Sequence, residues 1–116
     1  MAADPTPADE VVGVVHARAA EGKVDDLVAA FTACIEKTHQ EEGCLLYALH
    51  RDSADPSHVV LVERWRSQAD LDTHLTLPHV AELFAFAGTP GNLAAPPELY
   101  FVSALGIGQP GKATLG

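Results

Sequence analysis

The chain has 116 residues, enough for one domain with one modest hydrophobic core, and its apolar fraction of 47% is ordinary for a globular protein. Its formal net charge is −9 with only 7 lysines and arginines, and so acidic a surface repels phosphate, which argues against a nucleic-acid partner and against docking on anionic lipid. No apolar run approaches the ~20 residues that a membrane span needs.

The first half of the chain predicts a tail, a strand and a helix. Residues 1–10, MAADPTPADE, are acidic and proline-rich, without the basic and apolar regions of a secretion signal, and predict a disordered tail. The β-branched segment 11–19 predicts a strand that ends at the turn residues EGK. Residues 23–43 carry apolar side chains every three or four positions, which predicts an amphipathic helix ending at the final glycine.

The two cysteines bear on location. Cys34 and Cys44 form no CxxC pair, and without a secretion signal they predict reduced, partly buried thiols. We therefore expect a cytoplasmic protein.

The middle of the chain predicts a β-hairpin. Residues 44–51 and 58–66 are both typical of strands, and the short polar linker DSADPS between them contains a proline. In the second strand Leu61, Glu63 and Trp65 share one face, because side chains alternate along a strand.

Two helical segments and a last strand follow. Ser67 begins a capping-box-like SQAD sequence, which predicts a helix to His74 or Leu75. Pro78 suits the first turn of a further helix. Residues 98–106 predict a final strand, and residues 107–116 a loose C-terminal tail.

This order of elements predicts an α+β fold of the ferredoxin-like kind, βαββαβ, over residues 11–106. Right-handed crossovers around a central hairpin give a four-stranded antiparallel sheet with the helices on one face. Strands 11–19, 58–66 and 98–106 are apolar at consecutive positions, so the helix-free face is apolar as well. Such a face normally finds a partner, which predicts a homodimer packed sheet against sheet.

Three segments resemble the antibiotic biosynthesis monooxygenase domain family, which includes the quinol monooxygenases. EEGCLLYALHRD is similar to the family's E-x-G-C-L-x-Y segment, VLVERWRSQADLDTHLTLPHV to its E-x-W-x-S…H-L-x-T-P-H segment, and AAEGK to its strand-to-helix turn. The resemblance implies a dimeric ferredoxin-like α/β barrel. It also implies oxidation of phenolic or quinol substrates by O₂ without metal or flavin.

Such chemistry requires few parts. An electron-rich phenolate or enolate can itself pass an electron to O₂, so the protein must supply a dry apolar cleft and a proton acceptor. No glycine-rich phosphate cradle is needed, and GIGQPG, after the last strand, opens no helix and does not fit one. No cofactor is therefore expected.

The histidines of the second half are the candidates for proton transfer. His74 follows Leu71 by about one helical turn and either points into the cleft or lies on a polar surface; with the resemblance, it is the predicted catalytic base. His79, at the start of a helix, either lines the pocket or is simply solvated. The two are five residues apart across a proline, with no cysteine or carboxylate at a supporting spacing, so no metal site is predicted.

The other predicted pocket residues have open alternatives. Trp65 is either a cleft wall or core. Glu63 is a rim residue, an ion-pair partner in a dimer, or a proton acceptor, and Tyr47 has a hydroxyl that can line the same cleft. His16 can join either face of the sheet, whereas His39, His50 and His58 are interpreted as surface residues.

Three further pocket positions depart from relatives within the family. Leu61 and Leu71 stand where some aromatic-polyketide monooxygenases have Asn and Tyr, and Phe84 stands where the heme-degrading branch has a histidine. Leu61 and Leu71 count against the polyketide-type mechanism, and Phe84 counts against heme degradation. The leading prediction is a cofactor-independent monooxygenase acting on a small phenol, quinol or enolisable ketone. An isomerase of small carbonyl compounds and a non-catalytic ligand-binding dimer remain alternatives.

Overall fold

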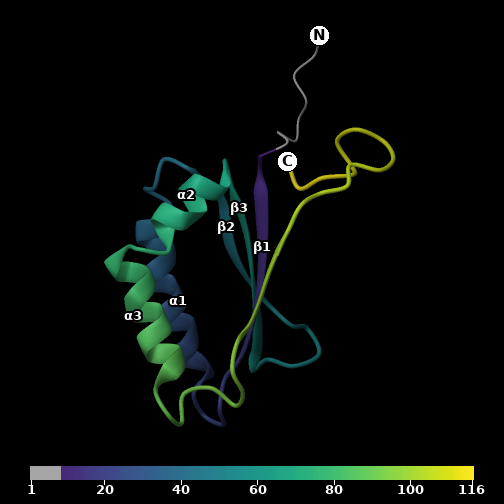
Figure 1. Ribbon diagram of the computed structural model, residues 1–116. Coiled ribbons are helices and arrows are strands. Elements are labelled where there is room, and N and C mark those ends of the chain that lie inside the picture. Colours follow the sequence, from purple (N-terminus) through teal and green to yellow (C-terminus); the bar gives the residue numbers. More distant parts are fainter. Residues whose placement is uncertain (1–8) are drawn as a thin grey trace.

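The computed structural model describes residues 9–116, which form one sheet covered by helices (Figure 1). The strands are β1 (Val11–Arg18), β2 (Cys44–Arg51), β3 (His58–Trp65) and β4 (Glu98–Val102), and the helices are α1 (Val24–Thr38), α2 (Gln68–His74) and α3 (Pro78–Gly88).

The sheet has the strand order β2-β3-β1-β4, and all its neighbouring strands are antiparallel. The helices lie together on one face, as Figure 1 shows. The predicted ferredoxin-like α+β fold is thereby confirmed, with the central hairpin β2–β3 placed beside β1. None of the helices within residues 9–116 is long and apolar enough to cross a membrane.

The core lies between the sheet and α1. Leu27 and Phe31 of α1 are buried, at 1% and 4% exposure, and they belong to one cluster with Val15, Ala17 and Leu61 of the central strands. On β3 the buried positions are every second residue from Val59 to Trp65, so the predicted face shared by Leu61, Glu63 and Trp65 is the helix-covered face. Alternation along the strand thus decides which side chains can reach the space under the helices.

The opposite face of the sheet carries no helix among the described residues. Val14, Val60 and Val62 are half-buried there, and Glu98, Tyr100 and Val102 of β4 are exposed on the same face, Tyr100 at 52%. An apolar helix-free face, as the sequence predicted, is therefore present.

Several predicted boundaries differ from the structure. Residues 1–8 of the predicted tail lie outside the described residues, but Glu10 is buried and forms an ion pair with Arg64, so the ordered chain begins before Val11. α1 ends at Thr38 instead of Gly43, and the intervening residues form turns. β4 ends at Val102, because the segment after it no longer pairs with β1.

Candidate active site

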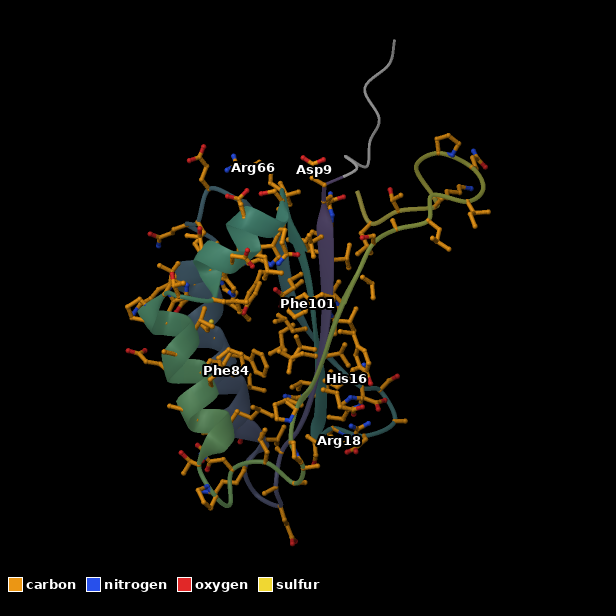
Figure 2. The ribbon with its side chains drawn as sticks, viewed as in Figure 1. Asp9, His16, Arg18, Arg66, Phe84 and Phe101 are labelled. Carbon is orange, nitrogen blue, oxygen red and sulfur yellow. The ribbon has the colours of Figure 1, made fainter. Side chains whose placement is uncertain are left out.

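A cleft opens between the helices and the sheet, with a volume of about 600 Å³ that includes its open mouth. Its walls are mostly aliphatic and aromatic, and its polar lining residues are Tyr47, Glu63 and His74. Figure 2 shows Phe84 pointing from α3 toward the sheet, where Phe101 of β4 lines the opposite wall.

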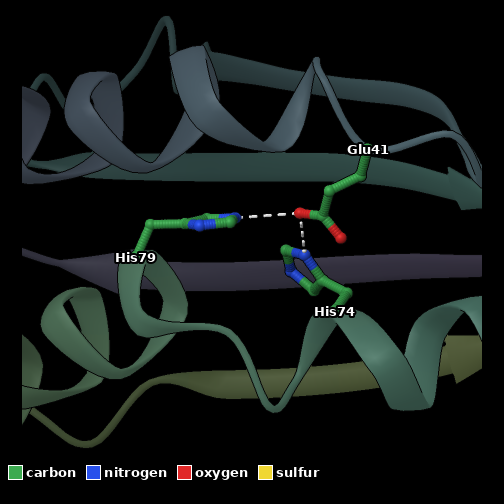
Figure 3. A group of neighbouring side chains, drawn as sticks. All are labelled: Glu41, His74 and His79. Atoms are coloured by element: carbon green, nitrogen blue, oxygen red, sulfur yellow. Dashed lines mark hydrogen bonds and ion pairs between the residues drawn. The ribbon is translucent and has the colours of Figure 1, made fainter.

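His74 lies at the inner end of this cleft and is held by a carboxylate. It is the last residue of α2 and only 2% exposed. Its Nδ1 lies 2.8 Å from Oε2 of Glu41, a residue of the turn between α1 and β2. Nε2 of His79, in the first turn of α3, lies 2.9 Å from the same oxygen (Figure 3). One carboxylate oxygen thus joins two histidines from two helices.

Aromatic rings enclose the His74 imidazole. Its centroid lies 4.4 Å from that of Trp65 and 5.3 Å from that of Tyr47, and the Tyr47 and Trp65 rings meet edge to face at 6.2 Å. These contacts leave the ring little freedom to rotate, which orients its Nε2.

The surroundings keep His74 neutral. Burial lowers the pKa of His74 below its ordinary value, and this effect outweighs the hydrogen bond that His74 donates to Glu41, which raises the pKa. A neutral imidazole that donates Nδ1–H to the Glu41 carboxylate carries its free lone pair on Nε2. Since His74 lines the cleft, this arrangement can accept a proton from a bound molecule.

Glu63 is a second buried carboxyl group at the cleft. Trp65 donates its Nε1–H to Oε1 of Glu63 at 2.7 Å. Burial raises the pKa of Glu63, more than that hydrogen bond lowers it. Gly13 on β1 pairs with Glu63 in the sheet, and its missing side chain leaves the room that the Glu63 side chain occupies.

Tyr47 contributes a neutral phenol. Burial is the main cause that raises the pKa of its hydroxyl, and the hydroxyl lies 3.7 Å from Sγ of Cys34. Tyr47 therefore presents an uncharged ring and hydroxyl beside His74 rather than a phenolate.

The structure places the predicted pocket residues in three groups. Tyr47, Leu61, Glu63, His74 and Phe84 line the cleft. Trp65 and Leu71 do not line the cleft. Trp65 is fully buried and packs against the His74 ring, and Leu71 belongs to the core cluster. His79 does not line the cleft, but it contacts Glu41 through Nε2 and meets the His74 ring edge to face, with the centroids 6.0 Å apart.

His16 lies on the wrong side of the sheet for the cleft, which corrects its assignment as a pocket residue. Its neighbours Val15 and Ala17 line the cleft, so alternation turns His16 to the helix-free face. There its Nδ1 lies 2.9 Å from Nε2 of His58. His58, interpreted from the sequence as a surface residue, is buried and bonds to Asp52 through Nδ1 at 2.9 Å.

Sequence reasoning missed Glu41. The residue opens the EEGC segment that carries the family resemblance, and that motif was the available indication of its role. The sequence places no carboxylate at a metal-ligand spacing from His74 and His79. The fold supplies one, and a donor atom from each of the three residues lies within 4.8 Å of the other two.

Comparisons with known proteins agree with this architecture. Over 62 residues the chain is 42% identical to the Mycobacterium tuberculosis protein named "Putative monooxygenase Rv0793", a segment covering 53% of this chain and 60% of that protein. The solved structure of Rv0793 matches with a TM-score of 0.76 and 27% identity over 83% of this chain and 95% of that one. PA3566 from Pseudomonas aeruginosa matches with a TM-score of 0.76 and 26% identity over 84% and 96% of the two chains.

The family relationship rests on the sequence of most of the fold. The model of the family described as "Antibiotic biosynthesis monooxygenase" matches residues 11–85, which run from β1 into α3 and include Glu41, Glu63, His74 and His79. This stretch is more than half of the chain. The chain therefore belongs to the antibiotic biosynthesis monooxygenase family.

Proposed function

We propose that this protein is a cofactor-independent monooxygenase that oxidises a small phenol, quinol or enolisable ketone with O₂, with His74 as the proton acceptor. The observation that carries the proposal is the neutral His74, which Glu41 holds at a largely apolar cleft whose other polar lining residues are Tyr47 and Glu63. The family relationship supports the reaction class.

The reaction needs two contributions from the protein. Nε2 of His74 accepts the proton of the substrate's hydroxyl or α-carbon, which leaves an electron-rich anion in the cleft. The apolar walls keep water away from that anion, which passes an electron to O₂ and then combines with the reduced oxygen. The hydroperoxide formed on the substrate carbon loses water: its O–O bond breaks, the remaining hydrogen on that carbon leaves as a proton, and one oxygen atom stays as a carbonyl. The substrate thereby supplies all four electrons that reduce O₂.

We also infer that the active form is a homodimer packed through the helix-free face. Its apolar residues, among them Val14, Val60 and Val62, are only half-buried in one copy. A second copy offers the same surface, and a two-fold contact between identical faces closes without leaving an open edge.

Oxygen consumption with a panel of hydroquinones and polyphenols, without added cofactor and corrected for autoxidation, tests the activity. Removing a positioned acid or base typically costs ~10²–10⁴-fold in rate, so His74→Ala should lose that much while remaining folded. The matched control is Glu36→Ala, since Glu36 is exposed on α1, away from both the cleft and the helix-free face, and should leave the rate unchanged.

The outcomes separate the candidate functions. If His74→Ala matched the wild type on every oxidised substrate, His74 would not be the base. If the wild type consumed no oxygen with any of them, an isomerase that uses the same base without O₂, or a ligand-binding dimer, would replace the monooxygenase. Turnover of an enolisable carbonyl compound, followed by solvent deuterium exchange at its α-carbon, would then distinguish those two.

A further inference from the structure

We propose that Glu41, His74 and His79 form a binding site for one divalent transition-metal ion of the zinc type, and that the ion blocks the base in the cleft. The second half of this proposal rests on the proposed function, whereas the metal site itself does not.

The donor atoms converge from three separate segments. Nδ1 of His74 and Nε2 of His79 both face Oε2 of Glu41, at 2.8 and 2.9 Å (Figure 3). Zinc bonds to imidazole nitrogen and carboxylate oxygen at about 2.0–2.2 Å, so tetrahedral ligands lie about 3.4 Å apart. A rotation of the Glu41 carboxylate that opens each separation by about 0.5 Å would admit the ion.

Burial and charge both suit such an ion. The side chains of Glu41 and His79 are 14% and 11% exposed, so the site is held by packing yet open on one side to an ion and to water as a fourth ligand. Glu41 supplies one negative charge and the histidines bind as neutral imidazoles, in a chain whose net charge is −9. Two nitrogen donors and one oxygen donor are the ligand set of many zinc sites with an open position.

Metal binding would change what His74 presents to the cleft. In the metal-free site Nδ1–H donates to Glu41 and Nε2 carries the lone pair. An ion bound at Nδ1 requires that nitrogen's lone pair, so the ring proton moves to Nε2 by exchange with solvent and the imidazole stays neutral. Nε2 is then an N–H donor and cannot accept the substrate's proton.

Titration calorimetry with zinc alone, on protein first treated with a chelator, tests the site. The wild type should bind one ion per chain, and His79→Gln and Glu41→Gln should each weaken binding by more than ~10-fold. Cobalt substituted for zinc should give the visible absorption bands of a tetrahedral site in the wild type but not in His79→Gln or Glu41→Gln. The matched control is His16→Gln, which removes a histidine of the other His–His pair and should leave zinc affinity unchanged.

Three results would overturn the metal site: no saturable binding, unchanged affinity in His79→Gln, or affinity lost in His16→Gln. The first would mean that the three side chains form a hydrogen-bonded network only. Circular dichroism of each variant checks that lost binding does not reflect unfolding.

The blocking effect has its own readout. Zinc at saturating concentration should stop oxygen uptake by the wild type, and a chelator should restore it. Uptake that continued in zinc-saturated protein would overturn the block while leaving the site intact. A wild type that binds zinc but never consumes oxygen would instead count against the proposed function, so the two failures are distinguishable.

Discussion

The carboxyl group of Glu63 is buried beside Trp65, where its ionised form loses solvation. That burial raises the pKa of Glu63. The stabilisation that the protonated carboxyl gives the folded state is therefore complete below the ordinary carboxyl pKa and is lost as the pH rises through the raised folded value. Glu63→Gln removes the charge but keeps an oxygen acceptor for Trp65. We expect this variant to have a higher Tm than the wild type at pH 7.

The difference should shrink as the pH falls toward the ordinary pKa of a glutamate, where the wild type is protonated in both states. Thermal denaturation followed by circular dichroism over a pH series measures it. Glu36→Gln, at an exposed position of α1, is the surface control. A Tm difference that is the same at every pH would show that ionisation of Glu63 is not its cause.

Gly13 leaves room for the same carboxyl group. A Cβ added there would lie 2.5 and 2.8 Å from Cγ and Cδ of Glu63 and 3.0 Å from a ring carbon of Phe101. Glu63 on β3 and Phe101 on β4 flank Gly13 on the sheet side of the cleft. Gly13→Ala must therefore displace one of these two side chains. Overpacking of this kind costs ~1–3 kcal/mol, which urea denaturation would measure as a loss in the free energy of unfolding.

Gly88→Ala is the control for that substitution. A Cβ at Gly88 meets nothing within 4 Å, and alanine near the end of α3 should be neutral or stabilising by up to ~1 kcal/mol. Equal effects at both glycines would mean that the close approach at Gly13 is relieved without cost.

At the scale of elements, the position of His74 depends on the short helix α2. Ser67 caps this helix, since its Oγ accepts the backbone N–H of Asp70 at 3.2 Å, as the SQAD sequence predicted. Loss of such a cap costs ~0.5–2 kcal/mol. In a helix of seven residues, that loss should also loosen the contact between His74 and Glu41.

Ser67→Ala should therefore lower both the free energy of unfolding and the rate of oxygen consumption, whereas Ser67→Thr keeps a capping hydroxyl and should recover most of each. Hydrogen exchange of the α2 amides would show whether the helix opens more often. If Ser67→Ala lost stability with no change in exchange within α2, the cap would act elsewhere.

At the scale of the molecule, the proposed homodimer depends on the helix-free face. If a second copy covers it, light scattering should give twice the chain mass of 12.2 kDa, through an interface above ~1,000 Å². Val62→Asp puts a charge in the middle of this face and should yield monomers. Ala29→Asp, at an exposed position of α1, should leave the mass unchanged. A wild-type monomer at micromolar concentration would contradict the homodimer.

Local sequence patterns were sufficient to predict the helices and strands, and which side chains of a strand share a face. Each of these patterns lies within one segment of the chain, so the sequence alone predicts the element. Apolar side chains recur every three or four positions in residues 23–43, and β-branched residues are frequent in residues 11–19 and 58–66. Alternation likewise placed Leu61, Glu63 and Trp65 together. The α+β order of elements then left few topologies to consider, and the ferredoxin-like one was found.

Tertiary structure decided which residues meet. Alternation places the His16 and Val15 side chains on opposite faces of the sheet. Only the packing of the helices decides which of those faces lines the cleft. Trp65 shares a face with Glu63, yet Glu63 lines the cleft and Trp65 does not. The difference depends on which side chains of the helices cover each position of the strand. Glu41 lies 33 residues before His74 and 38 before His79. Their meeting depends on how a turn and two helices pack on one sheet, which no local pattern records.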